Sequence, residues 1–115
     1  MSITVTLDTS AKPPVTVSPN PYDVSAGTAE SLTWVPATGQ TFTFKSLTFT
    51  SNPSCMGTPG VTPAQVTVQD TNGTNPGSPA VTYPYTVVVE YNGQSYSSDE
   101  TGVTGTGSKP GIRNR

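Results

Sequence analysis

The sequence predicts an all-β protein, built as a two-sheet sandwich of about eight short strands with Greek-key connections. The 115 residues include 21 Thr and 13 Ser, and β-branched Thr favours a half-solvated strand over a helix. The 12 Pro and 11 Gly residues interrupt any long helix. Between them, apolar and polar residues alternate in short runs roughly ten residues apart, which is typical of a sandwich.

Alternation with a period of two defines the strands expected in the first half of the chain, because successive side chains of a strand point to opposite faces. The apolar positions are Ile3, Val5 and Leu7, then Val15 and Val17, then Tyr22 and Val24, then Leu32 and Trp34, and finally Phe42, Phe44, Leu47 and Phe49. In the last run the apolar parity changes across Lys45-Ser46. This change of face predicts a β-bulge or a bend between sheets.

Two long loops rich in Pro and Gly, residues 50–63 and 71–79, divide the second half of the chain. Val66 and Val68 predict a short strand between them. The clearest alternation of the chain follows, at Val81, Tyr83, Tyr85, Val87, Val89 and Tyr91. Asn92-Gly93 then predicts a two-residue hairpin turn, with residues 94–98 as the returning strand.

One domain accounts for the whole chain, since 115 residues suit a single hydrophobic core. Residues 1–100 are expected to form the sandwich. Residues 101–115 are expected to form a Gly-rich, partly flexible C-terminal segment, in which Ile112 is able to anchor a last short strand. The expected core residues are Val5, Val15, Val17, Leu32, Trp34, Phe42, Phe44, Leu47, Phe49, Val66, Val68, Tyr85, Val87 and Val89.

The chain lacks residues on which most enzymatic chemistry depends. Histidine is absent, which removes the commonest general base and the usual ligand of zinc and copper. Cys55 is the one cysteine, so no intramolecular disulfide forms, and no histidine activates its thiol. We therefore expect no enzymatic activity, no cofactor and no metal.

Charge and hydropathy indicate which classes of partner the protein has and where in the cell it is located. A net charge of −2, with five Lys and Arg residues, provides no basic surface for nucleic acid. No apolar run is long enough for a membrane helix, and the N-terminus has no signal-peptide pattern. We expect a cytoplasmic protein without nucleic-acid or membrane partners, with export by another route left open.

Carboxylates offer the remaining route to catalysis. A hydrolase that uses carboxylates alone needs two of them about 5–9.5 Å apart across a cleft. The candidates are Asp23, Glu30, Asp70 and Glu90, but nothing in their spacing pairs them, so this function is the least favoured. Asp70-Thr-Asn-Gly73 resembles the start of a calcium loop but lacks the closing Glu, and it predicts a plain turn instead.

Two non-enzymatic functions remain. The leading one is a module that binds another protein or assembles with copies of itself, because low charge favours association and edge strands offer backbone groups for strand addition. The alternative is a protein that binds a carbohydrate or small ligand through surface tyrosines, with Tyr83, Tyr91 and Tyr96 as the candidate residues. The competing interpretation of these rings is packing in the core or between neighbouring strands.

Short motifs also resemble two known groups of proteins. The first is the immunoglobulin/cupredoxin-like sandwich, through the segments Val15-Thr-Val-Ser-Pro19, Val24-Ser-Ala-Gly27, Ser31-Leu-Thr-Trp34 and Tyr83-Pro-Tyr-Thr-Val87. Copper ligands are missing, so this resemblance implies the fold without the metal. The second is the DP-EP family of small bacterial proteins of unassigned function, through Pro19-Asn-Pro-Tyr22, Leu47-Thr-Phe49, Tyr91-Asn-Gly93, Tyr96-Ser-Ser-Asp99 and Lys109-Pro-Gly-Ile112. That resemblance implies a β-sandwich and no known activity.

Overall fold

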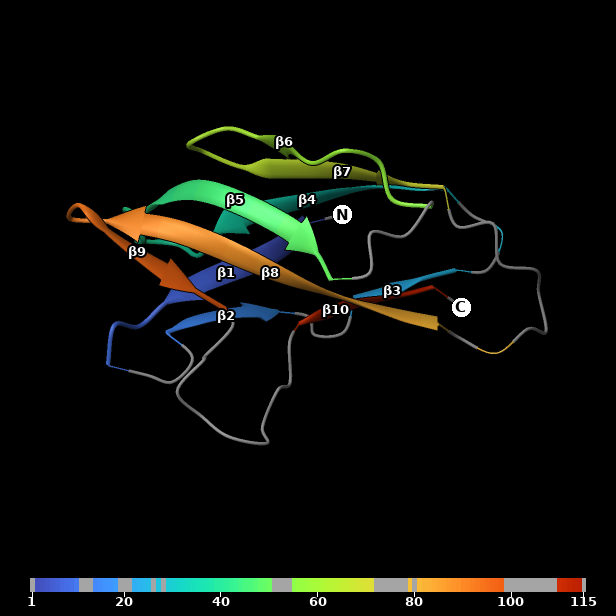
Figure 1. Ribbon diagram of the computed structural model, residues 1–115, viewed down its shortest axis with the longest axis horizontal. Helices are drawn as coiled ribbons and strands as arrows, with labels where there is room; N and C mark the ends of the chain where they lie inside the picture. The colour runs from blue at the N-terminus through green and yellow to red at the C-terminus, as the bar shows by residue number, and fades with distance from the viewer. Residues whose placement is uncertain are drawn as a thin grey trace.

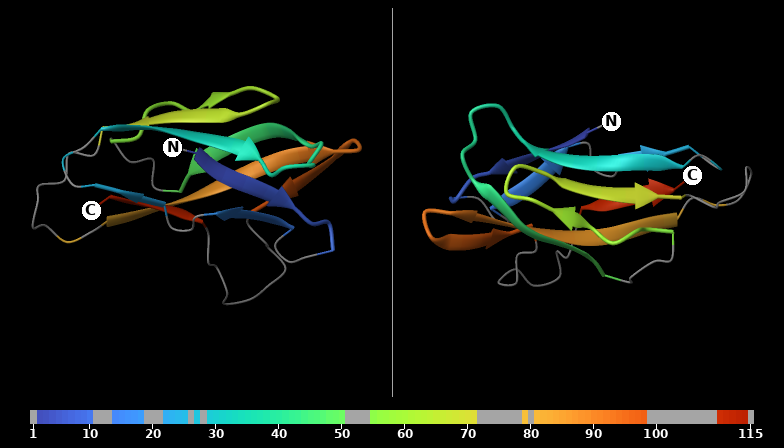
Figure 2. Two further views of the ribbon diagram at one scale, coloured as in Figure 1. Left: turned by 180° about the vertical axis from the view of Figure 1, so that it is seen from behind. Right: turned by 90° about the horizontal axis from the view of Figure 1, so that it is seen from above.

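The structure is a computed structural model that describes residues 2–10, 14–18, 22–25, 27, 29–50, 55–71, 79, 81–98 and 110–114. Within these residues ten strands form two five-stranded sheets, and no helix occurs. The sheets pack face to face, as Figures 1 and 2 show. The predicted all-β sandwich is therefore confirmed.

The first sheet has the strand order β2-β1-β4-β7-β6. Its members are β1 (Ser2–Leu7), β2 (Val15–Ser18), β4 (Glu30–Pro36), β6 (Gly60–Val61) and β7 (Val66–Asp70). β1 pairs with β4 in parallel, and all other neighbours are antiparallel. Apolar residues at alternate positions of β1, β4 and β7 form its inner face.

The second sheet has the order β3-β10-β8-β5, and β9 also pairs with β8. Its members are β3 (Tyr22–Val24), β5 (Thr43–Phe49), β8 (Val81–Tyr91), β9 (Gln94–Ser97) and β10 (Gly111–Asn114). β8 runs along the sandwich in Figure 1, from the end that holds β3 and β10 to the end that holds the hairpin with β9. This long strand therefore connects the two ends of the molecule.

Two strands, β6 and β10, lie in segments that the sequence predicted to be a loop and a partly flexible tail. β6 is a two-residue strand inside the predicted loop 50–63, and it forms because residues 60 and 61 pair with β7. β10 comes from the predicted tail, where Ile112 is fully buried and the strand pairs with both β3 and β8. The rest of that tail, residues 101–109, lies outside the described residues.

Two predictions about local geometry are confirmed. The pairing of β5 with β8 shifts register between Phe44 and Ser46, which is the predicted change of face across Lys45-Ser46. The hairpin between β8 and β9 turns at Asn92 and Gly93, with φ angles of 52° and 77°. Positive φ at both central residues is what a type I′ turn requires.

At both edges of the sandwich, the first sheet is connected to the second. β2 ends at Ser18 and β3 begins at Tyr22, so consecutive segments form the edge of one sheet and then the edge of the other. On the opposite side, the backbone N–H of Phe44 in β5 donates to the carbonyl of Pro63, between β6 and β7, at 3.1 Å. Paired edges of this kind leave fewer backbone groups open to other chains.

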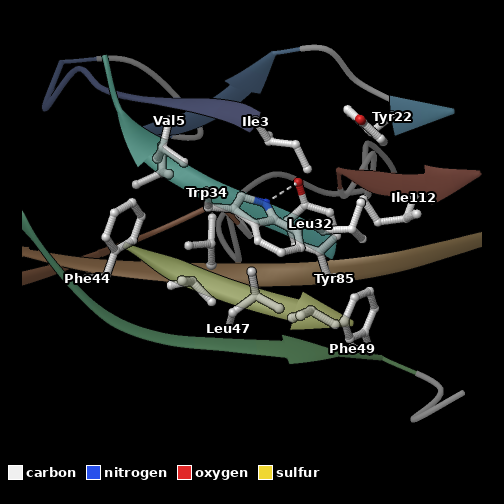
Figure 3. Packing of buried hydrophobic residues seen from close by; sticks show 14 of the residues in the cluster. Ile3, Val5, Tyr22, Leu32, Trp34, Phe44, Leu47, Phe49, Tyr85 and Ile112 are labelled. Atoms are coloured by element: carbon white, nitrogen blue, oxygen red, sulfur yellow. Dashed lines mark hydrogen bonds between the residues drawn. The ribbon is translucent and has the colours of Figure 1, made fainter. Parts of the chain in front are cut away.

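The core lies between the sheets and is centred on Trp34 and Tyr85 (Figure 3). The Trp34 Nε1–H donates to the Tyr85 hydroxyl at 2.9 Å, and the two rings meet edge to face with centroids 5.3 Å apart. All the expected core residues are buried except Val17, which is half-buried. The core also contains Ile3, Tyr22, Val24 and Ile112.

We expect the substitution Tyr85→Phe to lower the free energy of unfolding by about 1–3 kcal/mol, the range for leaving a buried donor unpaired. The reason is that both partners are fully buried, so the Trp34 Nε1–H would find no water. Urea denaturation followed by Trp34 fluorescence measures this loss. Tyr96→Phe is the control, because the Tyr96 hydroxyl donates to the exposed Gln94 side chain at 3.3 Å and has no other partner among the described residues. Equal effects of the two substitutions would contradict the role given to Tyr85.

Candidate functional site

The three candidate tyrosines do not form one surface strip. Tyr83 and Tyr91 lie at opposite ends of β8, about 26 Å apart at roughly 3.3 Å per residue. Tyr83 and Tyr96 are half-buried and pack against the core. Tyr91 is 36% exposed, which makes it the ring most available to a ligand.

Tyr91 borders a pocket of about 500 Å³ at the end of the sandwich that holds the β8–β9 hairpin. Three segments line the pocket: the end of β1 with the turn after it, the connection from β4 to β5, and the end of β8. The lining residues are Thr6, Leu7, Asp8, Thr9, Gly39, Gln40, Thr41, Phe42 and Tyr91. Most of the lining groups are hydroxyl, amide, carboxylate or backbone groups, set against a few apolar side chains.

Gln40 fixes the geometry of the pocket. Its backbone N–H donates to the Ala37 carbonyl at 3.0 Å, closing a turn in which Gly39 has a φ angle of 86°. Its side-chain Oε1 accepts the backbone N–H of Leu7 at 2.6 Å, which ties this turn to the end of β1. Gln40 is half-buried, and its Nε2 donates to no other described residue, so this group is available to a ligand.

Asp8 is the charged group of the pocket. Its Oδ1 accepts the Ser10 hydroxyl at 2.7 Å and the Ser10 backbone N–H at 3.0 Å. These hydrogen bonds, the hydroxyl first, hold the pKa of Asp8 below its ordinary value of 3.8. The carboxylate is therefore ionised at neutral pH, and Ser10 holds it in one orientation.

A pocket of this kind is suited to a small neutral molecule with many hydroxyl groups. The Tyr91 ring offers a flat apolar surface with a polar tip, while Gln40 and Asp8 offer a donor and an acceptor at the wall. Pockets for small ligands typically combine apolar surface with a few placed polar groups. Among the described residues that line the pocket, none is a Lys or Arg.

The sequence did not identify Asp8 or Gln40 as functional residues. Asp8-Thr-Ser10 and residues 38–41 have the composition of ordinary turns, and only the fold brings them together beside Tyr91. The parity of β8 did identify Tyr91, but it grouped the ring with Tyr83 because parity gives the face of a strand and not its end.

The predicted carboxylate candidates occupy different parts of the structure. Asp23 pairs with Arg113, whose Nε lies 2.5 Å from its Oδ1, and Glu90 is exposed on β8. Glu30 and Asp70 lie directly opposite each other on β4 and β7. Glu30 accepts the Tyr22 hydroxyl, while Asp70 is completely buried and accepts Asn114 Nδ2 at 3.1 Å. Burial keeps the Asp70 carboxylate away from any substrate in solution.

Cys55 and the calcium-like motif were the other candidate features. Burial raises the pKa of the half-buried Cys55 thiol, so the group stays protonated at neutral pH. Asp70 is the last residue of β7 and points into the interior, and residues 72–73 of the motif lie outside the described part of the chain. Among the described residues, no three Cys, Asp or Glu side chains gather around a point that could hold a metal ion.

No model of a known protein family matches the chain, and no curated protein matches it either. The resemblances to the cupredoxin-like sandwich and the DP-EP family therefore stay predictions, beyond the all-β, two-sheet architecture. Within the described ranges no helix is long and apolar enough to cross a membrane, and the cytoplasmic location stays a prediction.

We expect the Asp8 carboxyl to titrate below its ordinary pKa of 3.8 and to lose its charge only as the pH falls through that lowered value. Ser10→Ala should move the Asp8 pKa back up, because the Ser10 hydroxyl is the largest cause of the shift. Carbonyl-detected NMR titration of both proteins measures the two values. Ser2→Ala, in an exposed part of β1, is the control, and an unchanged Asp8 pKa in Ser10→Ala would contradict the assignment.

Proposed function

We propose that the protein is a non-enzymatic binding module that holds a small, neutral, hydroxyl-rich ligand, such as a saccharide, in the Tyr91 pocket. The observation that carries this proposal is one exposed aromatic ring beside a pocket of about 500 Å³ lined with Thr, Gln and Asp side chains. This volume falls within the range of ligand sites, about 300–1,000 Å³.

The chemistry of a saccharide matches the lining in two ways. A sugar ring has an apolar face of C–H groups that can rest on the Tyr91 ring, and hydroxyl groups that can both donate and accept. Asp8 accepts hydrogen bonds, Gln40 Nε2 donates them, and the Thr hydroxyls do either. An acidic sugar or a phosphate is disfavoured, because the ionised Asp8 would repel it and none of the described lining residues is cationic.

We expect Tyr91→Ala to weaken ligand binding about tenfold, since an aromatic contact worth about 1.4 kcal/mol corresponds to a tenfold change in affinity. A glycan array identifies the ligand, and calorimetry with that glycan measures the change. Tyr96→Ala is the matched control, because Tyr96 lies on the neighbouring strand β9 and does not line the pocket. Binding unaffected by Tyr91→Ala, or no binding to any glycan, would contradict the proposal.

A second candidate function is self-association through the edge of β5, and the hydrogen-bonding pattern of that strand favours it. The Thr50 N–H donates to Pro84 across the β5–β8 pair, and the Val87 carbonyl accepts Ser98 on the other side of β8. Along an antiparallel strand, the backbone N–H and C=O groups of successive residues point alternately toward one neighbouring strand and away from it. Since Thr50 points its N–H toward β8, the N–H and C=O groups of Leu47 and Phe49 point away from β8. They find no backbone partner among the described residues.

These outward groups face a groove of about 300 Å³, between β5 and residues 56–59. A second copy fits this edge by symmetry. A two-fold axis through Thr48 would place Leu47 opposite Phe49 of the second copy, and both pairs would exchange N–H···O=C bonds. The exposed side chain at the centre is an uncharged Thr, so nothing there repels its own copy.

We expect Thr48→Lys to reduce dimer formation, because it would place two like charges opposite each other across the axis. Sedimentation velocity over a range of concentrations measures the monomer–dimer equilibrium. Thr16→Lys, at an exposed position of β2 in the other sheet, controls for the added charge. A wild-type chain that stays monomeric at every concentration would rule out this second function without affecting the ligand proposal.

A further inference from the structure

One wall of the Tyr91 pocket combines three kinds of chemical group. Gln40 has an amide donor, Asp8 has a carboxylate acceptor, and Leu7 has an apolar side chain. We call these three residues the mixed wall. The proposed function uses the first two for the hydroxyl groups of a saccharide, and it gives the apolar side chain no part.

The residues of the mixed wall are neighbours in space. Asp8 follows Leu7 in the chain, and the Cα atoms of consecutive residues are about 3.8 Å apart. Gln40 Oε1 accepts the Leu7 backbone N–H at 2.6 Å, which places the Gln40 amide against the backbone on the other side of Leu7. Leu7 therefore lies between the donor and the acceptor, so a ligand substituent of a few atoms can reach all three residues.

The bond to Leu7 also determines which atom of the Gln40 amide is left for a ligand. Turning the amide over would place Nε2 against the Leu7 N–H, so that one donor would face another. Oε1 therefore stays on Leu7, and Nε2 donates to no other described residue. Because an amide nitrogen donates and does not accept, the ligand atom beside it has to be an acceptor.

Asp8 makes the opposite demand on the ligand. Its Oδ1 already accepts the hydroxyl and the backbone N–H of Ser10, while its Oδ2 accepts from no other described residue. An ionised carboxylate accepts and does not donate. The ligand atom beside Asp8 therefore has to carry a hydrogen that it can donate.

The apolar part of the wall favours a ligand with a small apolar group. Leu7 is half-buried and packs against the core, and Phe42, which is 5% exposed, lines the same pocket. A ligand hydroxyl placed here would leave the exposed part of Leu7 in contact with water. A methyl group would cover it, and the burial of apolar surface is favourable.

We propose that the mixed wall recognises an acetamido group, so that the ligand of the Tyr91 pocket is an N-acetylated hexosamine. This inference rests on the proposed function, because it names the class of saccharide that the same pocket binds. The acetamido carbonyl accepts from Gln40 Nε2, the acetamido N–H donates to Asp8 Oδ2, and the methyl group contacts Leu7. The pyranose ring then rests on Tyr91.

The shape of an acetamido group agrees with the order of the three residues. A secondary amide is planar and trans, so its C=O and N–H point to opposite sides while the methyl group lies at its end. Gln40 and Asp8 flank Leu7 on opposite sides of the backbone. The group is uncharged, so it adds no negative charge beside the ionised Asp8.

Three sugars that differ only at carbon 2 test this proposal. The probes are the methyl β-glycosides of N-acetylglucosamine, glucose and glucosamine, which carry an acetamido, a hydroxyl and an ammonium group there. We expect the acetamido sugar to bind the wild-type protein about tenfold more tightly than the hydroxyl sugar, since it adds an amide hydrogen bond and a buried methyl group. NMR titration of the backbone amides measures the three dissociation constants.

Gln40→Glu assigns the preference to the mixed wall. The carboxylate of the new side chain can still accept the Leu7 N–H, so the turn is retained, but its second oxygen replaces the Nε2 donor and repels the acetamido carbonyl. We expect the ratio of the two affinities to fall from about tenfold to about one. A purely structural role for Gln40 would weaken both sugars alike and leave the ratio unchanged.

Gln69→Glu is the matched control, because it makes the same change at an exposed position of β7 that does not line the pocket. It should keep the wild-type ratio. Urea denaturation of both variants checks that they are folded.

The outcomes separate this inference from the proposed function. If other glycans bind through Tyr91 but the acetamido sugar does not exceed the hydroxyl sugar, the acetamido inference is overturned and the saccharide pocket stands. The same holds if the ammonium sugar binds most tightly, because the Asp8 charge would then dominate recognition, or if the preference survives Gln40→Glu. The absence of binding to any glycan overturns both.

Discussion

The contact between Trp34 and Tyr85 is the constraint on which the arrangement of the sandwich depends. Trp34 lies in β4, the central strand of the first sheet, and Tyr85 lies in β8, the strand with the most partners in the second. A buried indole N–H has to find an acceptor, and the Tyr85 hydroxyl at 2.9 Å is that acceptor. This bond is specific in distance and direction, so together with the close packing of the core it fixes the position of β8 against the first sheet.

The fixed position of β8 determines what each end of the molecule can do. Tyr91 lies six residues after Tyr85 on the same face of β8. It is therefore at the end of the sandwich where the turn after β1 meets the β4–β5 connection. Tyr83 lies two residues before Tyr85, toward the opposite end of the sandwich, and its hydroxyl is beside Cys55. The first end is open and polar, and the second is polar but buried. The candidate ligand pocket therefore lies at one end of the sandwich, while the facing sides of the two sheets form the core.

Much of the fold could be predicted because it depends on local patterns. Period-two alternation located the strands of the core, the parity change located the bulge at Lys45-Ser46, and Asn92-Gly93 located the hairpin. β6 and β10 were harder, because Gly60–Val61 and Gly111–Asn114 are too short to alternate and are strands only through their partners. Sequence patterns give each strand a face, but sheet order is a long-range property.

The candidate sites show the same limit more sharply. Asp8 and Gln40 are 32 residues apart in sequence, and the pocket that they share exists only because β1 pairs with β4. Asp70 resembled a turn residue, since Asp beside Asn and Gly usually is one, yet the register of β7 turns its side chain inward. Nothing local to Asn114 indicates that a buried carboxylate and a thiol will contact its amide.

The buried polar side chains of Asp70 and Asn114 hold the last strand, β10, in place. β10 has four residues, and a short terminal strand frays unless side chains hold it. Ile112 holds it through the core, and Arg113 holds it on the outer face through Asp23 of β3. Asn114 holds it on the inner face through Asp70 of the opposite sheet. A chain in which only 10% of the residues are charged has few other means of attaching this strand.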